Sequence, residues 1–226
     1  MIKLVLFDLD GTLVDVFDLH FKLEREIIKG LYDVNIGKKE WITGIGLVEK
    51  DFLNNLLNPH DISSSEISKK HGTHTKEKKK MIIKSLKEKK RRPLAGVLPV
   101  LEELKKRKIT TGLVTGNQKD AGTEIVKAHC LRKYLAIEAY ADGIKERKKL
   151  VIKAIKMTEK KTGEKLRMNE ILVVGDSIYD IRSGKQNKCK TLAVATGYTS
   201  KKELKKEKPD YLFDNLKNTK AFLKIL

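Results

Sequence analysis

The amino-acid sequence predicts an α/β fold, in which helices cover both faces of a parallel sheet and an all-helical section is inserted near the N-terminus. From residue 93 onwards, short apolar runs of strand length alternate with segments of helical periodicity. Residues 15–92 differ, because their apolar side chains recur only at helical spacing. We therefore expect an α/β core domain made of residues 1–14 and 93–226, and a helical domain made of residues 15–92.

Five apolar runs predict the strands of the sheet. They are short and rich in Val, Ile, Leu or Thr, and they cover residues 2–7, 110–114, 137–140, 170–174 and 191–194. Helices are expected between them, at residues 97–104, 120–130 and 150–157. Strands that alternate with helices form parallel sheets, and in such sheets ligand-binding groups gather beyond the carboxyl ends of the strands.

The inserted section is expected to contain helices only. An amphipathic helix is predicted over residues 17–31, and a Gly-containing turn at 41–46 separates it from a second helical face over 48–57. An Asn-Pro pair ends that second helix. Serines at 63–65 can cap a short third helix, and an apolar stripe on a basic segment predicts a further helix over 76–90.

The net charge of the chain is strongly positive. Lys and Arg number 49 against 30 Asp and Glu, which gives +19. Residues 76–92 hold ten cations against two acids and are expected largely on the outer face of one helix. Such a surface attracts anions, either phosphorylated small molecules or nucleic acid. Lys dominates and no aromatic residue lies in the run as a stacking platform, which argues against nucleic acid and favours a solvated helix face.

Length and composition indicate a cytoplasmic enzyme without a membrane span. At 226 residues, the chain is long enough for a large core and a smaller lobe. The two cysteines, Cys130 and Cys189, lie in periodic or apolar contexts, so a disulfide framework is not expected. No apolar run approaches the roughly 20 residues of a membrane helix. The sequence leaves a monomer and a homodimer equally open.

The first predicted strand ends in two acids, Asp8 and Asp10, and Gly11 then turns the chain. Side chains two residues apart on a strand point the same way. Placing two carboxylates at the end of a buried strand is costly unless a cation or a reaction uses them. An ordinary Asp-Gly turn is the simpler alternative. A calcium loop is excluded, because Leu13 and Leu19 stand where that loop needs Gly and Glu.

Three segments resemble motifs of the haloacid dehalogenase superfamily, in the order that the family has them. Residues 8–13, DLDGTL, resemble its first motif, and Thr115 at the end of a strand resembles its second. Residues 175–180, GDSIYD, follow a buried strand and resemble the last motif. The resemblance implies a Rossmann-like core with a small inserted helical cap, as in the phosphoglycolate-phosphatase-like subfamily. Residues 44–47 resemble the loop of that cap that reaches toward the substrate.

The resemblance also implies catalytic and metal-binding roles for four acids. Asp8 would be the nucleophile that accepts the phosphoryl group, and Asp10 would act as general acid and base. Mg²⁺ would be held by the carboxylates of Asp8 and Asp176 and by the backbone carbonyl of Asp10. Asp180 is expected to orient Asp176 or a water on the metal.

Phosphate-binding groups are expected from two further segments. Thr115 and the residues after it, Gly116 and Asn117, would hold phosphoryl oxygens. A cation is also expected before the helix that starts near residue 150. The usual family pattern of Lys followed by Pro is absent here, so both Lys145 and Arg147 stay open as that cation.

The function implied is that of an Mg²⁺-dependent phosphatase that hydrolyses a small phosphate monoester through an aspartyl-phosphate. The alternatives are a phosphosugar mutase or another phosphotransferase of the same superfamily, and a basic nucleic-acid-binding protein on this scaffold. Clustered acids argue against the last, since a polyanion gains nothing from them. A dehalogenase needs no metal and, in the family, lacks the acid that Asp10 supplies.

Overall fold

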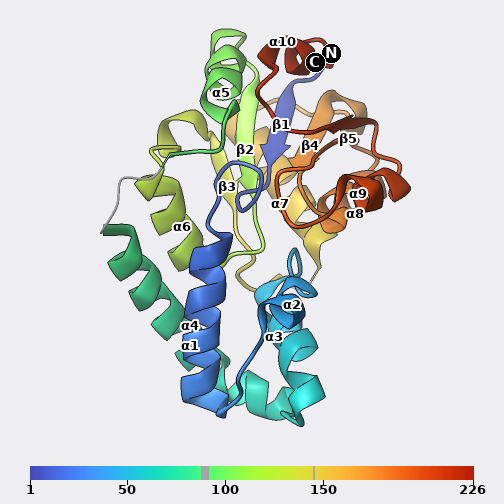
Figure 1. The fold of residues 1–226 in the computed structure, drawn as a ribbon. Helices are drawn as coiled ribbons and strands as arrows, with labels where there is room; N and C mark the ends of the chain where they lie inside the picture. The colour runs from blue at the N-terminus through green and yellow to red at the C-terminus, as the bar shows by residue number, and fades with distance from the viewer. Residues whose placement is uncertain (88–91, 145) are drawn as a thin grey trace.

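A computed structural model describes residues 1–87, 92–144 and 146–226 of the chain, and it contains a six-stranded parallel sheet (Figure 1). The strand order is β3-β2-β1-β4-β5-β6, and each neighbouring pair is parallel. The strands are β1 (Leu4–Phe7), β2 (Thr110–Val114), β3 (Ile137–Ala139), β4 (Ile171–Gly175), β5 (Lys190–Val194) and β6 (Tyr211–Phe213). The expected α/β fold is confirmed, and β6 is an additional strand.

Helices cover both faces of this sheet, and four more form the inserted section. The insertion contains α1 (Phe17–Tyr32), α2 (Lys38–Ile42), α3 (Glu49–Leu57) and α4 (Ser64–Lys87). The helices of the sheet layers are α5 (Val97–Lys106), α6 (Lys119–Ala128), α7 (Arg147–Thr162), α8 (Ile178–Gln186), α9 (Lys201–Lys206) and α10 (Thr219–Leu223). Three 3₁₀ turns complete the described elements: Asn58–His60, Arg132–Tyr134 and Met168–Glu170.

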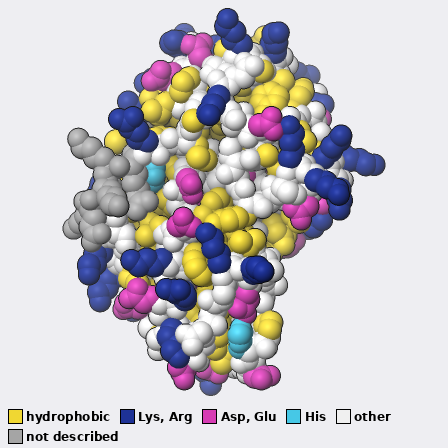
Figure 2. Space-filling view, in the orientation of Figure 1, with side chains coloured by type: hydrophobic (Ala, Val, Ile, Leu, Met, Phe, Trp, Pro, Cys, Tyr) yellow, Lys and Arg dark blue, Asp and Glu magenta, His cyan; other side chains and the backbone are white. Residues whose placement is uncertain are grey.

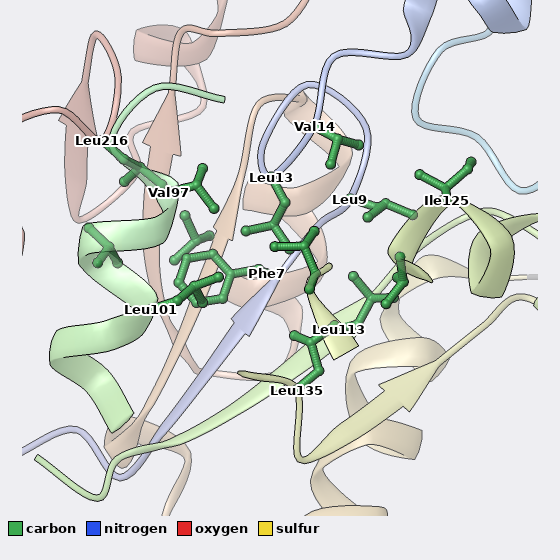
Figure 3. Packing of buried hydrophobic residues seen from close by; sticks show 14 of the residues in the cluster. Phe7, Leu9, Leu13, Val14, Val97, Leu101, Leu113, Ile125, Leu135 and Leu216 are labelled. Carbon is green, nitrogen blue, oxygen red and sulfur yellow. The ribbon is translucent and has the colours of Figure 1, made fainter. Parts of the chain in front are cut away.

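Strand β1 lies at the centre of the sheet because its side chains supply apolar surface to both layers. Val5 and Phe7 belong to one buried cluster, together with side chains of α5, α6 and α10. Figure 3 shows Phe7 in this cluster beside Leu101 and Leu113. Leu4 and Leu6 point to the opposite layer and pack with side chains of α7. Such two-sided burial explains why the strand reads as a continuous apolar run.

The inserted helices lie beyond the carboxyl ends of the strands, toward which the arrow of β1 points (Figure 1). They bury an apolar cluster of their own, which includes Trp41, Phe52 and Leu56. The described elements of the inserted section are helices, as the sequence predicts. The division into domains at residues 15–92 stays a prediction.

Two details of the insertion differ from the sequence-based expectation. Helix α2 occupies part of the segment that was expected to be a turn, and its first turn is closed by Glu40, whose carboxylate accepts a hydrogen bond from the Gly37 N–H at 3.2 Å. Two separate helices were expected between residues 63 and 90, whereas α4 is one continuous helix of 24 residues. The short apolar periodicity at its centre is interrupted by buried polar residues, His74 and Lys78.

The two ends of the described chain lie together at the edge opposite the insertion (Figure 1). The N–H of Ile2 donates a 2.8 Å hydrogen bond to the carbonyl of Leu226. Within residues 1–87, 92–144 and 146–226, the structure contains no helix with the length and apolar character needed to cross a membrane.

Candidate active site

The three motif segments meet at one end of the sheet, because they follow three adjacent strands. Asp8 comes directly after β1, Thr115 after β2, and Asp176 after β4. Their side chains line a cavity of about 100 Å³, which the insertion covers from the other side. Each of the three residues is at least nine-tenths buried. The sequence therefore brings the expected acids and the threonine to a single closed site.

Asp8 pairs with a cation that the sequence left open. Arg147 Nη2 lies 2.5 Å from Asp8 Oδ1 and 2.6 Å from Asp180 Oδ1. Burial raises the pKa of the Asp8 carboxyl well above its usual range, and Arg147 acts in the opposite direction. Of the two expected cations, Lys145 lies outside the described residues. The structure places Arg147 between the two carboxylates.

Asp176 is held by a residue of the first motif and lies close to Asp180 of the last motif. The Thr12 hydroxyl donates a 2.8 Å hydrogen bond to Asp176 Oδ1. Burial and the neighbouring Asp180 raise the pKa of Asp176 to about 8. Gly11 has φ +82°, and a side chain there would collide with the carboxylate of Asp176. Glycine in the turn after β1 is thus required both by backbone conformation and by the close approach of Asp176.

Asp180 is fixed by the start of helix α8. Its Oδ2 accepts hydrogen bonds from the Ser177 N–H at 3.1 Å and from the Ser177 hydroxyl at 2.7 Å. The hydroxyl in turn accepts from the Asp180 N–H, which completes a capping box at the first turn of α8. The other carboxylate oxygen of Asp180, Oδ1, accepts a hydrogen bond from Arg147 Nη2. The capping interaction explains why two acids four residues apart remain close together.

The acidic cluster suits a divalent metal ion. Ligand oxygens of Asp8, Asp176 and Asp180 lie within 4.8 Å of one another and are all buried. Among the described residues, the Arg147 side chain pairs with two of these carboxylates, those of Asp8 and Asp180. Hard cations such as Mg²⁺ prefer carboxylate oxygens, and an added positive charge would offset the repulsion among them. The carboxylate of Asp10 is not part of this cluster, and the expected metal contact of its backbone carbonyl stays a prediction.

Asp10 is oriented by an asparagine from the second motif and by a histidine of the insertion. Asn117 Nδ2 donates to Asp10 Oδ2 at 2.5 Å, and His20 Nε2 lies 3.5 Å from the same oxygen. Burial raises the pKa of Asp10, but His20 and Asn117 outweigh burial, so the net pKa lies below its ordinary value. Asn117 was expected to hold phosphate. Its side-chain amide contacts the residue expected to be the general acid and base, and phosphate binding by Asn117 stays a prediction.

The hydroxyl of Thr115 is prepared to donate toward the cavity. Its oxygen accepts from the Asn117 N–H at 3.2 Å and from Asn117 Nδ2 at 3.1 Å. Because both bonds use the oxygen as an acceptor, the hydroxyl hydrogen stays free for a ligand. Gly116 faces the insertion, since a Cβ atom on it would lie 2.9 Å from the Leu47 carbonyl oxygen.

The wall of the cavity on the insertion side contains charges that sequence reasoning missed. Lys78 Nζ lies 2.6 Å from Glu24 Oε1 and 3.1 Å from Glu49 Oε1, and all three side chains are buried. His74 Nε2 adds a 2.7 Å contact to Glu24. Lys78 was expected on the outer face of its helix, which is wrong. One signal was available: His20 and Glu24 recur at helical spacing on the apolar face of α1.

The structure thus combines a parallel α/β sheet with a cluster of buried acids at the carboxyl ends of its central strands. The chain belongs to the haloacid dehalogenase-like hydrolase family, whose sequence profile matches residues 5–194. This membership confirms the resemblance of the three motifs.

Two similar proteins are named as a phosphatase and a pyrophosphatase. The chain is 26% identical over 220 residues to a phosphoglycolate phosphatase of Vibrio parahaemolyticus, with 95% of this chain and 93% of the relative covered. It is 24% identical over 217 residues to the pyrophosphatase PpaX of Oceanobacillus iheyensis, with 96% and 94% covered. The crystal structure of CbbY from Rhodobacter sphaeroides in complex with phosphate has 19% identity, a TM-score of 0.79 and 96% of both chains covered. This last similarity shows the shared fold.

Proposed function

We propose that this protein is an Mg²⁺-dependent phosphatase that hydrolyses a small phosphate monoester through an aspartyl-phosphate. The observation that carries the proposal is the convergence of Asp8, Asp10, Thr115 and Asp176 on one small cavity. Phosphate monoesters hydrolyse extremely slowly in water, with enzymatic accelerations of up to about 10²¹. A site for this reaction therefore needs a nucleophile, a proton donor and neutralising charge together.

Each of these needs has a residue in the structure. A carboxylate oxygen of Asp8 attacks phosphorus, and the bond to the leaving oxygen breaks as Asp10 supplies a proton. Asp10 then takes a proton from the water that cleaves the aspartyl-phosphate, which releases phosphate and restores Asp8. The lowered pKa of Asp10 favours the carboxylate form that this second step requires. Thr115 offers a hydroxyl donor to a phosphoryl oxygen, and the Arg147 guanidinium supplies positive charge beside Asp8.

Three carboxylates are the proposed holders of the metal: those of Asp8, Asp176 and Asp180. When bound, Mg²⁺ supplies positive charge that draws electron density from the phosphoryl oxygens. Thr12 keeps Asp176 turned toward this position.

The substrate is proposed to be small because the cavity of about 100 Å³ is closed by the insertion. Phosphoglycolate and pyrophosphate, the compounds in the names of the two relatives, are suitable first candidates. A mutase would return the phosphoryl group to a sugar, so the fate of that group distinguishes the alternatives.

A panel of phosphate compounds tests the proposal. The purified protein would be incubated with Mg²⁺ and phosphoglycolate, pyrophosphate, several sugar phosphates or an aryl phosphate, with release of inorganic phosphate as the measurement. We expect hydrolysis of at least one small compound, and its loss by at least about 10³-fold in Asp8→Asn with an unchanged circular dichroism spectrum. Unchanged turnover by that variant would rule out the mechanism.

Metal removal provides an independent test. Excess chelator should abolish hydrolysis of the best substrate, and Mg²⁺ should restore it. Asp176→Ala should raise the Mg²⁺ concentration needed for half-maximal rate by about tenfold or more, since ligand and near-ligand changes commonly cost 10–100-fold in metal affinity. Full activity in chelator would contradict the proposed cofactor.

A further inference from the structure

One side chain joins the insertion directly to the nucleophile. Arg147 Nη1 donates to the carbonyl oxygen of Gly46 at 3.0 Å, while Nη2 donates to Asp8 Oδ1 and Asp180 Oδ1. Gly46 lies 101 residues away in sequence, in the loop at residues 44–47, which we call the insertion loop. The side chain of Arg147 is 9% exposed. A single buried guanidinium therefore contacts the insertion loop, the candidate nucleophile and the start of α8.

The insertion loop is docked closely against the core around this arginine. Gly46 has φ +90°, and a Cβ atom there would lie 2.7 Å from Tyr179 Cδ2 and 3.0 Å from Ser177 Oγ. Leu47 approaches the second motif in the same way, since a Cβ atom on Gly116 would lie 2.9 Å from its carbonyl oxygen. The loop thus touches the segments that follow β2 and β4 as well as Arg147. Glycine at position 46 is needed for both its backbone conformation and this contact.

We propose that Arg147 is a positioning residue that couples docking of the insertion loop to the orientation of Asp8. The inference deepens the proposed phosphatase function and concerns the same site. A guanidinium has several donors in a rigid planar fork, so it can hold a carbonyl and two carboxylates at once. A lysine ammonium is a compact point charge and keeps the cation without this span. Coupling of this kind acts in both directions: the docked loop orders Arg147, and the ordered arginine holds the loop.

The coupling makes the site complete only when the insertion is closed. With the loop docked, Arg147 is fixed against Asp8 Oδ1, and the cavity is covered. With the loop undocked, Arg147 loses the Gly46 carbonyl, and the site opens to water. A substrate that closes the insertion would thereby also align the nucleophile.

Two variants break the link from opposite sides. Arg147→Lys keeps a positive charge near Asp8 but loses the fork. Gly46→Ala keeps every charged group and displaces the loop from Tyr179. Gly163→Ala is the matched control, because Gly163 also has a positive φ of +76° but no described atom lies within 4 Å of a Cβ placed there. All variants would be checked for folding by thermal unfolding.

Steady-state kinetics on the double-mutant cycle give the first readout. We expect each single variant to lower kcat/KM by about 10- to 100-fold, and the double variant to lower it by no more than about threefold beyond the stronger single change. A decrease in kcat/KM of the double variant equal to the product of the two single decreases would overturn the proposal. Gly163→Ala should match the wild type.

Fluorescence gives a second readout that needs no substrate. Trp41 is the only tryptophan of the chain, is 3% exposed and lines the cavity next to the insertion loop. Quenching of its emission by acrylamide should increase in Arg147→Lys and in Gly46→Ala, with no further increase in the double variant. Unchanged quenching in Arg147→Lys would overturn the coupling, even if Gly46→Ala does not fold. Failure of the wild type to hydrolyse any ester would overturn the proposed function and leave this measurement intact.

Discussion

At the scale of single residues, the described part of the site sets three clustered carboxylates beside the one guanidinium of Arg147. Burial raises the pKa of both Asp8 and Asp176, and Arg147 is one cation among three clustered carboxylates. A buried charge without a partner costs several kcal/mol, as a rough general estimate. The arrangement is therefore costly in the empty protein and favourable once cations occupy the cavity. Such a balance is typical of a site built for metal and phosphate.

Asn117 has a role at this scale that its position in the sequence did not indicate. Its side chain connects Asp10 to Thr115 through two hydrogen bonds from Nδ2, at 2.5 and 3.1 Å. The residue was expected to contact phosphate because it follows a strand end. Side-chain direction within a turn depends on tertiary contacts, so the sequence could place Asn117 in the site but not assign its partner.

Asn117→Ala should slow the reaction through Asp10. Asn117 lowers the pKa of Asp10, so its removal should move the limb of the pH–rate profile that reports Asp10 to higher pH. We expect kcat to fall roughly tenfold to a hundredfold, less than in Asp10→Asn, where loss of the acid and base costs about 10²–10⁴-fold. The measurement is kcat in each variant from the lowest pH at which the protein stays folded up to neutral pH, because the lowered pKa of Asp10 places its limb on the acid side.

The neighbouring Gln118→Ala is the control for Asn117→Ala. In the described structure, Gln118 precedes α6 and its side chain makes no cap hydrogen bond. Its replacement should leave the pH profile in place. Coinciding profiles for wild type and Asn117→Ala would show that Asn117 does not act on Asp10.

At the scale of elements, the sequence predicts the strands that are buried on both faces but not the short strand at the edge of the sheet. Strands β1, β2 and β4 are apolar runs with nearly every residue buried, so composition alone identified them. Strand β6 has only three residues, all half-buried at the sheet edge, and it was missed. Helix α4 was divided because His74 and Lys78 occupy buried positions where the helical pattern requires apolar residues. At these two positions, ion pairs with Glu24 on α1 take the place of apolar contacts.

Those ion pairs hold together the helices of the insertion. Lys78 on α4 contacts Glu24 on α1 and Glu49 on α3. Burial acts to lower the pKa of the Lys78 ammonium, but the two carboxylates outweigh burial, so its net pKa lies above the ordinary value. Breaking a buried pair by removing one partner is strongly destabilising, since the other charge stays buried. The network therefore contributes to the position of α4 as well as to the wall of the cavity.

Stability should depend on pH through Glu49. Burial acts to raise its pKa, but Lys78 outweighs burial, and the pKa of Glu49 falls from 4.5 to about 2. A carboxyl whose pKa is lowered by folding stabilises the folded state at pH values above its ordinary pKa. This stabilisation is lost as the pH falls toward 2. The free energy of unfolding should thus be lower in Glu49→Gln than in the wild type by on the order of 3 kcal/mol at pH 7. The difference should shrink between pH 4.5 and 2.

Urea unfolding at a series of pH values measures this difference. Glu26→Gln is the control, since Glu26 is an exposed acid on α1. We expect it to change the free energy of unfolding by less than about 0.5 kcal/mol at every pH. A Glu49→Gln difference that stayed constant down to pH 2 would contradict the proposed ion pair.

At the scale of the whole molecule, the excess of +19 is distributed over the surface. Figure 2 shows Lys and Arg side chains scattered over the visible face, with Asp and Glu between them. Part of the basic segment is not on the surface at all, because Lys78 is buried in the ion-pair network. The outer side of α4 still carries exposed lysines, among them Lys76, Lys80 and Lys84. Residues 88–91 of the same segment lie outside the described residues.

These exposed lysines should affect the encounter with an anionic substrate and leave the chemical step unchanged. The Debye length is about 8 Å at physiological salt, so charges on the outer side of α4 act on the cavity only weakly there. Changing Lys76, Lys80 and Lys84 to Gln should lower kcat/KM by roughly two- to tenfold at low salt. We expect kcat to stay unaltered and the difference in kcat/KM to disappear at physiological salt.

A second triple variant separates local from overall charge in this last prediction. Lys202, Lys205 and Lys206 are exposed on α9, and changing them to Gln removes the same total charge. If the field near the insertion attracts the substrate, the α4 variant should lose more kcat/KM at low salt than the α9 variant. Equal losses would instead assign the effect to net charge. A fall in kcat for the α4 variant, or binding of nucleic acid at physiological salt that this variant loses, would show that these lysines contact a ligand directly.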